Sequence, residues 1–389
     1  MIDTKPSFST AEDLLDQLLA GTLEELDIPP QLAQVARQRY AQVGMFLNQY
    51  GDSAGRSAWD VYPQGSFRLN TVVRPITLSG DFDIDVVCVR GVDKKSTTQD
   101  SLKAEVGMAL AQFAKTADAG TCQQGGRCWT LDYPHLHFHM DVLPSIPDAA
   151  NRPSGILLAD RDYSRWLPSD PIRFAGWFRD RMKTELLRKQ AQLAESRRST
   201  IEQVPEDEVK TTLQRAVQAL KRHRDLFFVG APASRPPSIL ITTLAAHAYK
   251  GEQNLYEAVV MMAESMPKHI VRDGSDWYVL NPVQPQENFA DTWRTNPERR
   301  DNFERWLGGL RQDLGETRQQ RGLQLVAERL ARGFGGEVMK SAERLGEKYL
   351  KTRESGGLTM AATGLLSTQA SDSLKVRKHG FYGSEDQAK

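Results

Sequence analysis

Three aspartates, Asp81, Asp83 and Asp85, alternate with other residues in the stretch GDFDIDVVCV, and this pattern constrains the fold more than any other feature. Alternation with apolar and β-branched residues predicts a β-strand, in which residues two apart point to the same side, about 6.6 Å from each other. Like charges at that spacing repel, so a largely apolar strand keeps them only where an opposite charge offsets the repulsion. The pattern therefore predicts a strand whose carboxylates bind cations.

A third carboxylate, Asp141, follows in the stretch HFHMDVLP, which also reads as a strand. Hard divalent cations take oxygen ligands, and two such ions about 4 Å apart stabilise the attacking and leaving oxygens of phosphoryl transfer. If the two strands are neighbours, Asp83, Asp85 and Asp141 (here the acidic trio) complete such a site. We expect two Mg²⁺ ions there, with Mn²⁺ as an alternative.

A glycine and a serine, Gly65 and Ser66, stand shortly upstream of the acidic strand. A glycine lets the backbone approach a phosphate closely, and a serine offers both its hydroxyl and its own N–H to phosphate oxygens. Alone, a Gly-Ser pair carries little information. Placed before an acidic pair and a later third carboxylate, it predicts that the site binds a phosphorylated substrate.

The order GSF, DIDVVCV and HMDVLP resembles the polymerase-β-like nucleotidyltransferases. In that superfamily a Gly-Ser precedes an Asp-x-Asp that runs into an apolar strand, and a third Asp follows. The resemblance assigns metal binding and catalysis to Asp83, Asp85 and Asp141, and it leaves Asp81 peripheral, because the family's acidic pair runs directly into the apolar strand. It assigns nucleotide binding to Gly65 and Ser66.

Later segments extend the resemblance. AVQALKRHRDLF is similar to the helix of the oligoadenylate-synthase-like branch whose lysine, here Lys221, reaches nucleotide phosphates. PPSILITTLAAHAY is similar to the next helix of that branch, led here by Ser238. WYVLNPVQPQENFADTW resembles a segment of the bacterial cGAS/DncV-like nucleotidyltransferases. The resemblance implies synthesis of a cyclic di- or trinucleotide second messenger from NTPs, ATP among them, in bacterial anti-phage (CBASS-type) signalling.

The order of elements and the resemblance predict an α+β chain in three parts. Residues 1–168 carry the leading helices and a polymerase-β-like nucleotidyltransferase palm, a mixed sheet with helices. Residues 169–352 form a helical, oligoadenylate-synthase-like lobe that closes the nucleotide cleft, with one helix expected over 317–351. Residues 353–389 are rich in small and polar residues and are expected to form a flexible tail.

Composition bears on partners and location. The 389 residues include 50 basic and 50 acidic ones, and this neutral balance argues against a protein that grips nucleic acid over its whole surface. Three cysteines are too few, and wrongly spaced, for the zinc insert with which cGAS grips double-stranded DNA. The sequence has no signal peptide and no apolar stretch of membrane-spanning length, so we expect a cytoplasmic protein without a membrane partner.

The tail adds an expectation about protein partners. Its RKHGFYG stretch resembles an aromatic-glycine motif near the C-termini of some family members. The resemblance implies a ubiquitin-ligase-like or HORMA-type regulatory protein that acts on the tail or on the helical lobe.

Other interpretations account for parts of the pattern. The acidic strand could be a solvated edge strand. His137, His139 and Asp141 resemble the His-x-His-x-Asp opening of binuclear zinc hydrolases, but Val142 stands where those proteins place a further histidine. We expect these histidines and His135 instead to share the strand face of Asp141 or to pair with nearby acids. A related enzyme could add nucleotides to RNA or to a protein, and an inactive chain could bind nucleotide as a sensor; the intact acidic trio favours an active enzyme.

Overall fold

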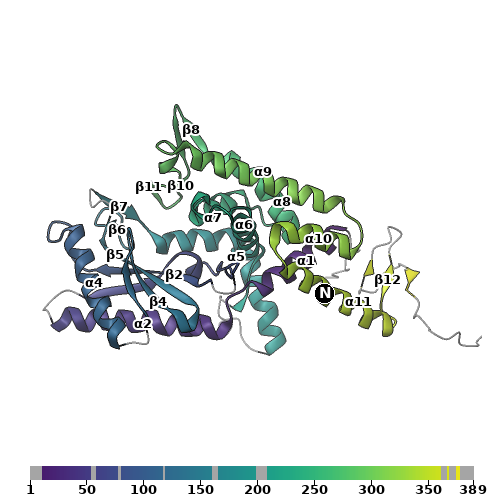
Figure 1. Cartoon of the computed structure of the whole chain (residues 1–389), viewed down its shortest axis with the longest axis horizontal. Helices are drawn as coiled ribbons and strands as arrows, with labels where there is room; N and C mark the ends of the chain where they lie inside the picture. Colours follow the sequence, from purple (N-terminus) through teal and green to yellow (C-terminus); the bar gives the residue numbers. More distant parts are fainter. Residues whose placement is uncertain are drawn as a thin grey trace, which may run out of the picture.

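The computed structural model describes residues 11–53, 58–77, 80–116, 119–159, 165–198, 208–360, 366–367 and 374–376. A part built on a β-sheet occupies the lower left of Figure 1, and a helical part lies above it and to its right. The RKHGFYG stretch of the predicted tail lies outside the described residues.

A seven-stranded mixed sheet organises the first part. Its strands are β1 (Trp59–Pro63), β2 (Phe82–Arg90), β3 (Cys122–Gln124), β4 (Trp129–Tyr133), β5 (Phe138–Pro147), β6 (Ile156–Ala159) and β7 (Trp166–Ser169). The order is β1-β2-β5-β4-β3, with β6 paired to β5 and β7 paired to β6. Helices α2 (Pro30–Ser53) and α4 (Gln99–Thr116) pack together and share one apolar core with the sheet.

The acidic strand β2 lies inside the sheet. It pairs antiparallel with β1 and parallel with β5, so both of its edges are hydrogen-bonded. Parallel pairs occur in covered sheets, and Ile84, between Asp83 and Asp85, is fully buried. The edge-strand interpretation is therefore wrong, and the acidic residues of β2 are built into the centre of the fold.

Helices dominate the second part. They are α5 (Pro171–Arg197), α6 (Thr212–Phe227), α7 (Ser238–Ala248), α8 (Leu255–Ser265), α9 (Pro297–Gln319), α10 (Leu323–Phe334) and α11 (Glu337–Glu354). Three of them, α5, α6 and α8, begin at a side-chain cap. The Asp170 side chain accepts from the backbone N–H of Arg173 at 2.9 Å, and Thr211 and Gln214 form a capping box on α6.

The first helix, α1 (Ala11–Glu25), crosses between the two parts of the chain. It precedes the sheet in the sequence, yet it packs against α11 and α8, and its leucines belong to the core of the helical part. The N-terminal and C-terminal helices are thus held together by one shared core.

The long helix expected over 317–351 is not continuous. α9 ends at Gln319, and α10 and α11 are separated at Gly335 and Gly336. Gly335 has φ +99°, a conformation that side-chain-bearing residues rarely adopt, and a Cβ there would press on the Arg222 guanidinium. The apolar periodicity continued across this break, which is why the pattern alone suggested one helix.

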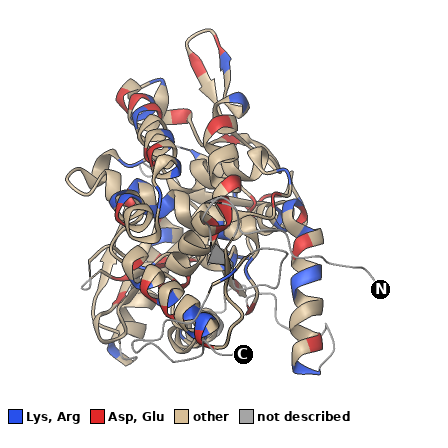
Figure 2. Ribbon diagram, turned by 90° about the vertical axis from the view of Figure 1, so that its right-hand side faces the viewer, with Lys and Arg blue, Asp and Glu red and all other residues tan. Residues whose placement is uncertain are grey.

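Short strands complete the described chain. Two hairpins are formed by β8 (Val271–Asp273) with β9 (Asp276–Tyr278) and by β10 (Leu280–Asn281) with β11 (Gln284–Asn288), and a small sheet by β12 (Thr359–Met360), β13 (Leu366–Ser367) and β14 (Leu374–Lys375). Figure 2 shows basic and acidic residues interspersed along the helices, in keeping with the neutral net charge. Within the described ranges, each helix is too short or too polar to cross a lipid bilayer.

Candidate active site

The parallel register of β2 and β5 brings the acidic trio together. Asp85 lies opposite Asp141 in the ladder, and Asp83 lies opposite His139, so these side chains share one face of the sheet. One carboxylate oxygen from each member of the trio lies within 4.8 Å of the other two. The alternate, apolar residues of both strands point to the opposite face, into the core beneath α2 and α4.

The trio is electrostatically strained in the absence of a cation. Burial, followed by the negative charges of Asp83 and Asp141, raises the pKa of Asp85 to about 8. Asp141 is oriented by Thr130, whose hydroxyl donates to Asp141 Oδ1 at 2.5 Å. Asp83 is the exposed member and faces the open side of the site.

This donor set fits a hard divalent cation. It offers only carboxylate oxygens, and a doubly charged ion would offset the repulsion that disfavours ionised Asp85. The acidic trio can therefore hold a divalent metal. When bound at such a site, the metal neutralises phosphate charge and lowers the pKa of an attacking hydroxyl.

Gly65 and Ser66 lie directly against this site. They begin the short helix α3 (Gly65–Arg68), and the preceding Gln64 N–H donates to the carbonyl of Asp85 at 2.8 Å. Gly65 has φ +60°, and a Cβ there would collide with the Asp85 carboxylate. Glycine is thus required both by its backbone conformation and by its contact with the acidic trio.

A cleft of about 520 Å³ lies beside these residues, between the sheet part and the helical part of the molecule. Its lining includes Gly65, Ser66, Asp81, Asp83, Asp85, Lys221, Arg224, Asp225, Arg235 and Ser238. Asp141 is not among the residues that line the cleft; it lies beside Asp85 in the strand ladder, with carboxylate oxygens of the trio within 4.8 Å of one another. The fold therefore gathers the acidic, Gly-Ser and helical site residues predicted from the sequence around one cleft.

Lys221 approaches the trio from α6. Its ammonium donates to the carbonyl of Thr71 at 3.2 Å and to the Thr71 hydroxyl at 3.1 Å, and the side chain is buried. Burial, followed by the neighbouring charge of Arg224, lowers the pKa of Lys221 to about 7. The charges of Asp85 and Asp83 oppose this shift, which places the lysine within electrostatic reach of the acidic trio.

Ser238 begins α7, after two prolines. Its hydroxyl forms no cap with its own helix and instead accepts a hydrogen bond from Arg224 Nη1 at 2.8 Å. The contact joins α6 to α7 along the wall of the cleft.

The histidines are arranged differently from the expectation. His135 lies in a 3₁₀ turn and His137 has φ +53°, because β5 begins only at Phe138. Only His139 therefore shares the strand face of Asp141. Pairing with acids is nonetheless found: His139 Nε2 lies 3.5 Å from Asp83 Oδ1, and this hydrogen bond raises the pKa of His139.

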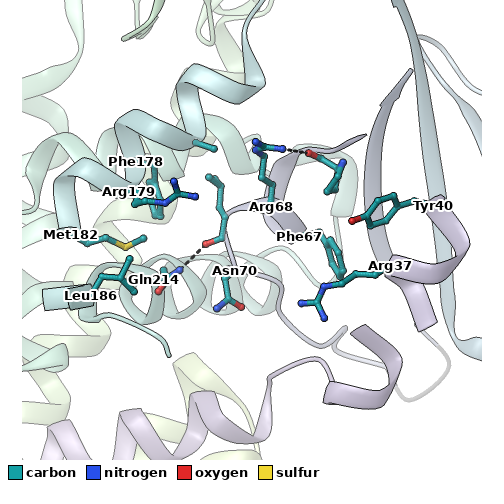
Figure 3. A pocket seen from close by; sticks show the side chains of 13 residues that line it. Arg37, Tyr40, Phe67, Arg68, Asn70, Phe178, Arg179, Met182, Leu186 and Gln214 are labelled. Carbon is teal, nitrogen blue, oxygen red and sulfur yellow. Dashed lines mark hydrogen bonds between the residues drawn. The ribbon is translucent and has the colours of Figure 1, made fainter. Parts of the chain in front are cut away.

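A second hollow, of about 280 Å³, lies among residues of α2, α3, α5 and α6 (Figure 3). It is lined by Arg37, Tyr40, Pro63, Phe67, Arg68, Leu69, Asn70, Ala175, Phe178, Arg179, Met182, Leu186 and Gln214. None of these residues belongs to the site predicted from the sequence. The 520 Å³ cleft is the one that carries the acidic trio, and we assign the site to it.

Several residues that line the cleft or orient its side chains were not foreseen, among them Thr71, Arg224, Asp225 and Thr130. Arg224 and Asp225 lie three and four residues after Lys221 on α6, so they share the helix face of the lysine. This spacing could have indicated them. Thr71 and Thr130 come from other elements, and no local pattern marks them.

The fold and the carboxylate site define a nucleotidyltransferase with a polymerase-β-like palm. Residues 15–181 match the family model of the Second Messenger Oligonucleotide or Dinucleotide Synthetase domain. A c-di-GMP synthase of Roseivirga ehrenbergii is 26% identical over 378 residues, which cover 96% of this chain and 99% of that relative. The cyclic dinucleotide synthase CdnG of Bradyrhizobium diazoefficiens is 26% identical over 90% of this chain and 89% of its own length.

Solved structures agree with this fold. The structure of Bradyrhizobium diazoefficiens CdnG in complex with GTP superposes with a TM-score of 0.68 at 23% identity and covers 85% of this chain and 99% of that one. Apo DncV of Vibrio cholerae superposes with a TM-score of 0.59 at 14% identity, covering 84% of this chain and 96% of that one. Residues 15–181 thus match this synthetase domain, and the chain is similar over nearly its whole length to bacterial cyclic dinucleotide synthases of the cGAS/DncV-like nucleotidyltransferase kind. The family, the α+β fold class and the enzyme class predicted from the sequence are confirmed.

Proposed function

We propose that this enzyme condenses two GTP molecules into cyclic di-GMP and releases two pyrophosphates, with the acidic trio as ligands for two Mg²⁺ ions. The observation that carries the proposal is the convergence of three carboxylates within 4.8 Å beside Gly65, Ser66 and Lys221. The choice of GTP is supported by the relative named c-di-GMP synthase, which aligns with this chain over nearly its whole length.

In the proposed reaction the residues of the chain bind and orient the two nucleotides. Backbone N–H groups at Gly65 and Ser66 approach the triphosphate of the donor, and the Lys221 ammonium supports the same phosphates. Asp141, held by Thr130, accepts the proton of the acceptor ribose hydroxyl as that oxygen attacks the donor α-phosphorus. The bond from the α-phosphorus to its bridging oxygen breaks, and pyrophosphate leaves; a second transfer closes the ring.

Product analysis tests this proposal. Purified protein with Mg²⁺ is given GTP alone, ATP alone or all four NTPs, followed by phosphatase treatment and chromatography against a cyclic di-GMP standard. We expect a phosphatase-resistant product from GTP alone that co-migrates with the standard and is absent in Asp141→Asn. Asp273→Asn, an exposed change in the β8 hairpin, is the matched control and should leave product formation unchanged.

Other outcomes of that assay identify other functions. A product that requires ATP would replace cyclic di-GMP by a mixed or adenine product; the sequence predicts ATP among the substrates and leaves the bases of the product open. A ladder of products longer than three nucleotides would favour terminal transfer to RNA. Labelled nucleotide retained on the protein would favour protein nucleotidylation, and binding without turnover would favour a silent sensor.

Metal and nucleotide together should stabilise the protein. The cations offset the repulsion around Asp85, and the nucleotide binds only the folded protein. A ligand of the folded state at a hundredfold excess over its Kd adds about 3 kcal/mol to the free energy of unfolding. We expect a thermal shift of several degrees with Mg²⁺ plus GTP, a smaller shift with Mg²⁺ alone, and similar results with Mn²⁺. An unchanged melting temperature would count against the metal site; Asp83→Asn should abolish the shift.

We further propose a role in CBASS-type anti-phage signalling in the cytoplasm. The similarity to bacterial cyclic dinucleotide synthases supports it, and the structure of an Escherichia coli CdnC:HORMA-deltaN complex superposes on this chain with a TM-score of 0.62 at 14% identity. A HORMA-type or ubiquitin-ligase-like regulator acting on the tail or helical lobe is part of this proposal. Removing residues 355–389 should leave synthesis from GTP unchanged and abolish covalent attachment to other proteins in cells.

A further inference from the structure

Arg224 lies one helical turn beyond Lys221 and lines the same cleft. Its Nη1 donates to Ser238 Oγ at 2.8 Å and to the carbonyl of Pro236 at 3.1 Å. Its Nε and Nη2 both donate to Asp225 Oδ1, at 2.9 and 2.7 Å. The guanidinium is buried, so these bonds hold it in one orientation.

The direction of the Arg224–Ser238 bond determines what the serine can do. An arginine only donates, so Ser238 Oγ is the acceptor and its own hydrogen remains available for another partner. Four of the five guanidinium N–H groups are engaged by Ser238, Pro236 and Asp225. The fifth, on Nη2, is the remaining donor of this side chain.

A second arginine provides a comparison within the same cluster. Arg235 Nη1 lies 3.3 Å from the same Asp225 oxygen and also lines the cleft. Every hydrogen bond found for its side chain goes to Asp225, within the described part of the chain, and none reaches Ser238. The two arginines therefore share the carboxylate but differ in their contact with the serine.

We infer that Arg224 is a positioning residue that orients the Ser238 hydroxyl as a hydrogen-bond donor to the terminal phosphates of the donor nucleotide. The inference rests on the proposed function and specifies how that site holds a triphosphate. Two buried cations, Lys221 and Arg224, line the same cleft as the carboxylates of Asp83 and Asp85, so a polyanion with bound cations complements both kinds of charge. Asp225, which also lines the cleft, holds the arginine by accepting from its Nε and Nη2.

Binding of a non-reacting analogue tests the inference. The probes are guanosine 5′-[α,β-methylene]triphosphate and GMP, each with Mg²⁺, measured by calorimetry on the full chain. Ser238→Ala and Arg224→Gln should each weaken the triphosphate analogue about tenfold, as expected for one charge-assisted hydrogen bond, and leave GMP within about twofold. The double variant should resemble the single variants, because both remove the same interaction.

The controls separate positioning from packing. Ser238→Thr keeps the hydroxyl and should restore binding, whereas Arg235→Gln removes a partner of Asp225 but not of Ser238 and should weaken the analogue less than threefold. In steady-state kinetics, Ser238→Ala and Arg224→Gln should raise the KM for GTP by a larger factor than they lower kcat. If Arg224→Gln does not fold, the same binding experiment is made with Arg224→Lys, which keeps the positive charge.

Three results would overturn the inference. These are multiplicative losses in the double variant, equal losses in Arg224→Gln and Arg235→Gln, or equal losses of GMP and analogue; each would indicate a general packing role for the α6–α7 contact. The binding experiment is independent of the product. A wild-type enzyme that binds the analogue but makes no cyclic di-GMP would refute the proposed product and leave the positioning of Ser238 standing.

Discussion

Asp85→Asn should lower the rate of cyclic-nucleotide synthesis by about a thousandfold or more, because each 1.4 kcal/mol lost from transition-state stabilisation costs tenfold in rate and metal clamping supplies several kcal/mol. The substitution preserves shape but removes one charge from the acidic trio, whose members lie within 4.8 Å of each other. Initial rates of pyrophosphate release from GTP with Mg²⁺ measure the effect.

The same variant should be more stable than the wild type when metal is absent. Burial and the neighbouring aspartates raise the pKa of Asp85 to about 8, so the folded state holds this proton more tightly than the unfolded chain. Ionisation of Asp85 therefore lowers wild-type stability progressively as pH rises from the ordinary aspartate range towards 8. In EDTA the gain in melting temperature from Asp85→Asn should be larger at pH 8 than at pH 5.

Asp60→Asn is the matched control for both measurements. Asp60 is an exposed aspartate on β1, in the same sheet, and it is not a member of the acidic trio. Its replacement should change neither the rate nor the pH dependence of stability. The proposed role of Asp85 fails if Asp85→Asn retains more than a tenth of the wild-type rate, or if its stabilisation is the same at both pH values.

Gly65→Ala should reduce synthesis by about a hundredfold, because displacing groups at a reacting centre by about 1 Å has effects of that size. The added Cβ would occupy the space of the Asp85 carboxylate, and the left-handed backbone at φ +60° adds about 1–2 kcal/mol of strain. Both the position of the acidic trio and the backbone donors to phosphate are disturbed together. Rates with GTP and melting temperatures measure the two effects.

Gly308→Ala is the control for this substitution. Gly308 lies within α9, has no positive φ, and a Cβ there meets nothing within 4 Å. Alanine should therefore stabilise the helix by about 0.5–1 kcal/mol without changing activity. Full activity in Gly65→Ala would contradict the assignment of this glycine to the site.

Local patterns predicted several of the side chains that the fold brings together. The alternation in β2 depends on strand geometry, which places Asp83 and Asp85 on one face wherever the strand packs. The caps of α5 and α6 were not predicted, although they also depend on local contacts: Asp170 and Thr211 accept from backbone N–H groups three residues away. Local patterns failed where a single residue interrupts a periodicity, as with Gly335 between α10 and α11.

Long-range packing lay beyond such patterns. The position of α1 against α11, and the hydrogen bond from Arg224 to Ser238, join segments whose proximity depends on the whole core. The start of β5 at Phe138, which removes His137 from the strand, depends on its pairing with β2 and β4. Several packing arrangements compete for each of these features, and residue spacing along the chain does not tell which of them is the most stable.

The sequence by itself determined which residue types this protein uses, a Gly-Ser, an Asp-x-Asp, a third aspartate and a helical lysine, because their spacing follows from the geometry of single strands and helices. Only the tertiary structure decided that β5 lies parallel to β2 in the register that sets Asp141 beside Asp85, and that α6 brings Lys221 to the same cleft. The physical reason is that register and lobe placement are selected by burial of the shared apolar cores, an energy distributed over residues far apart in the chain.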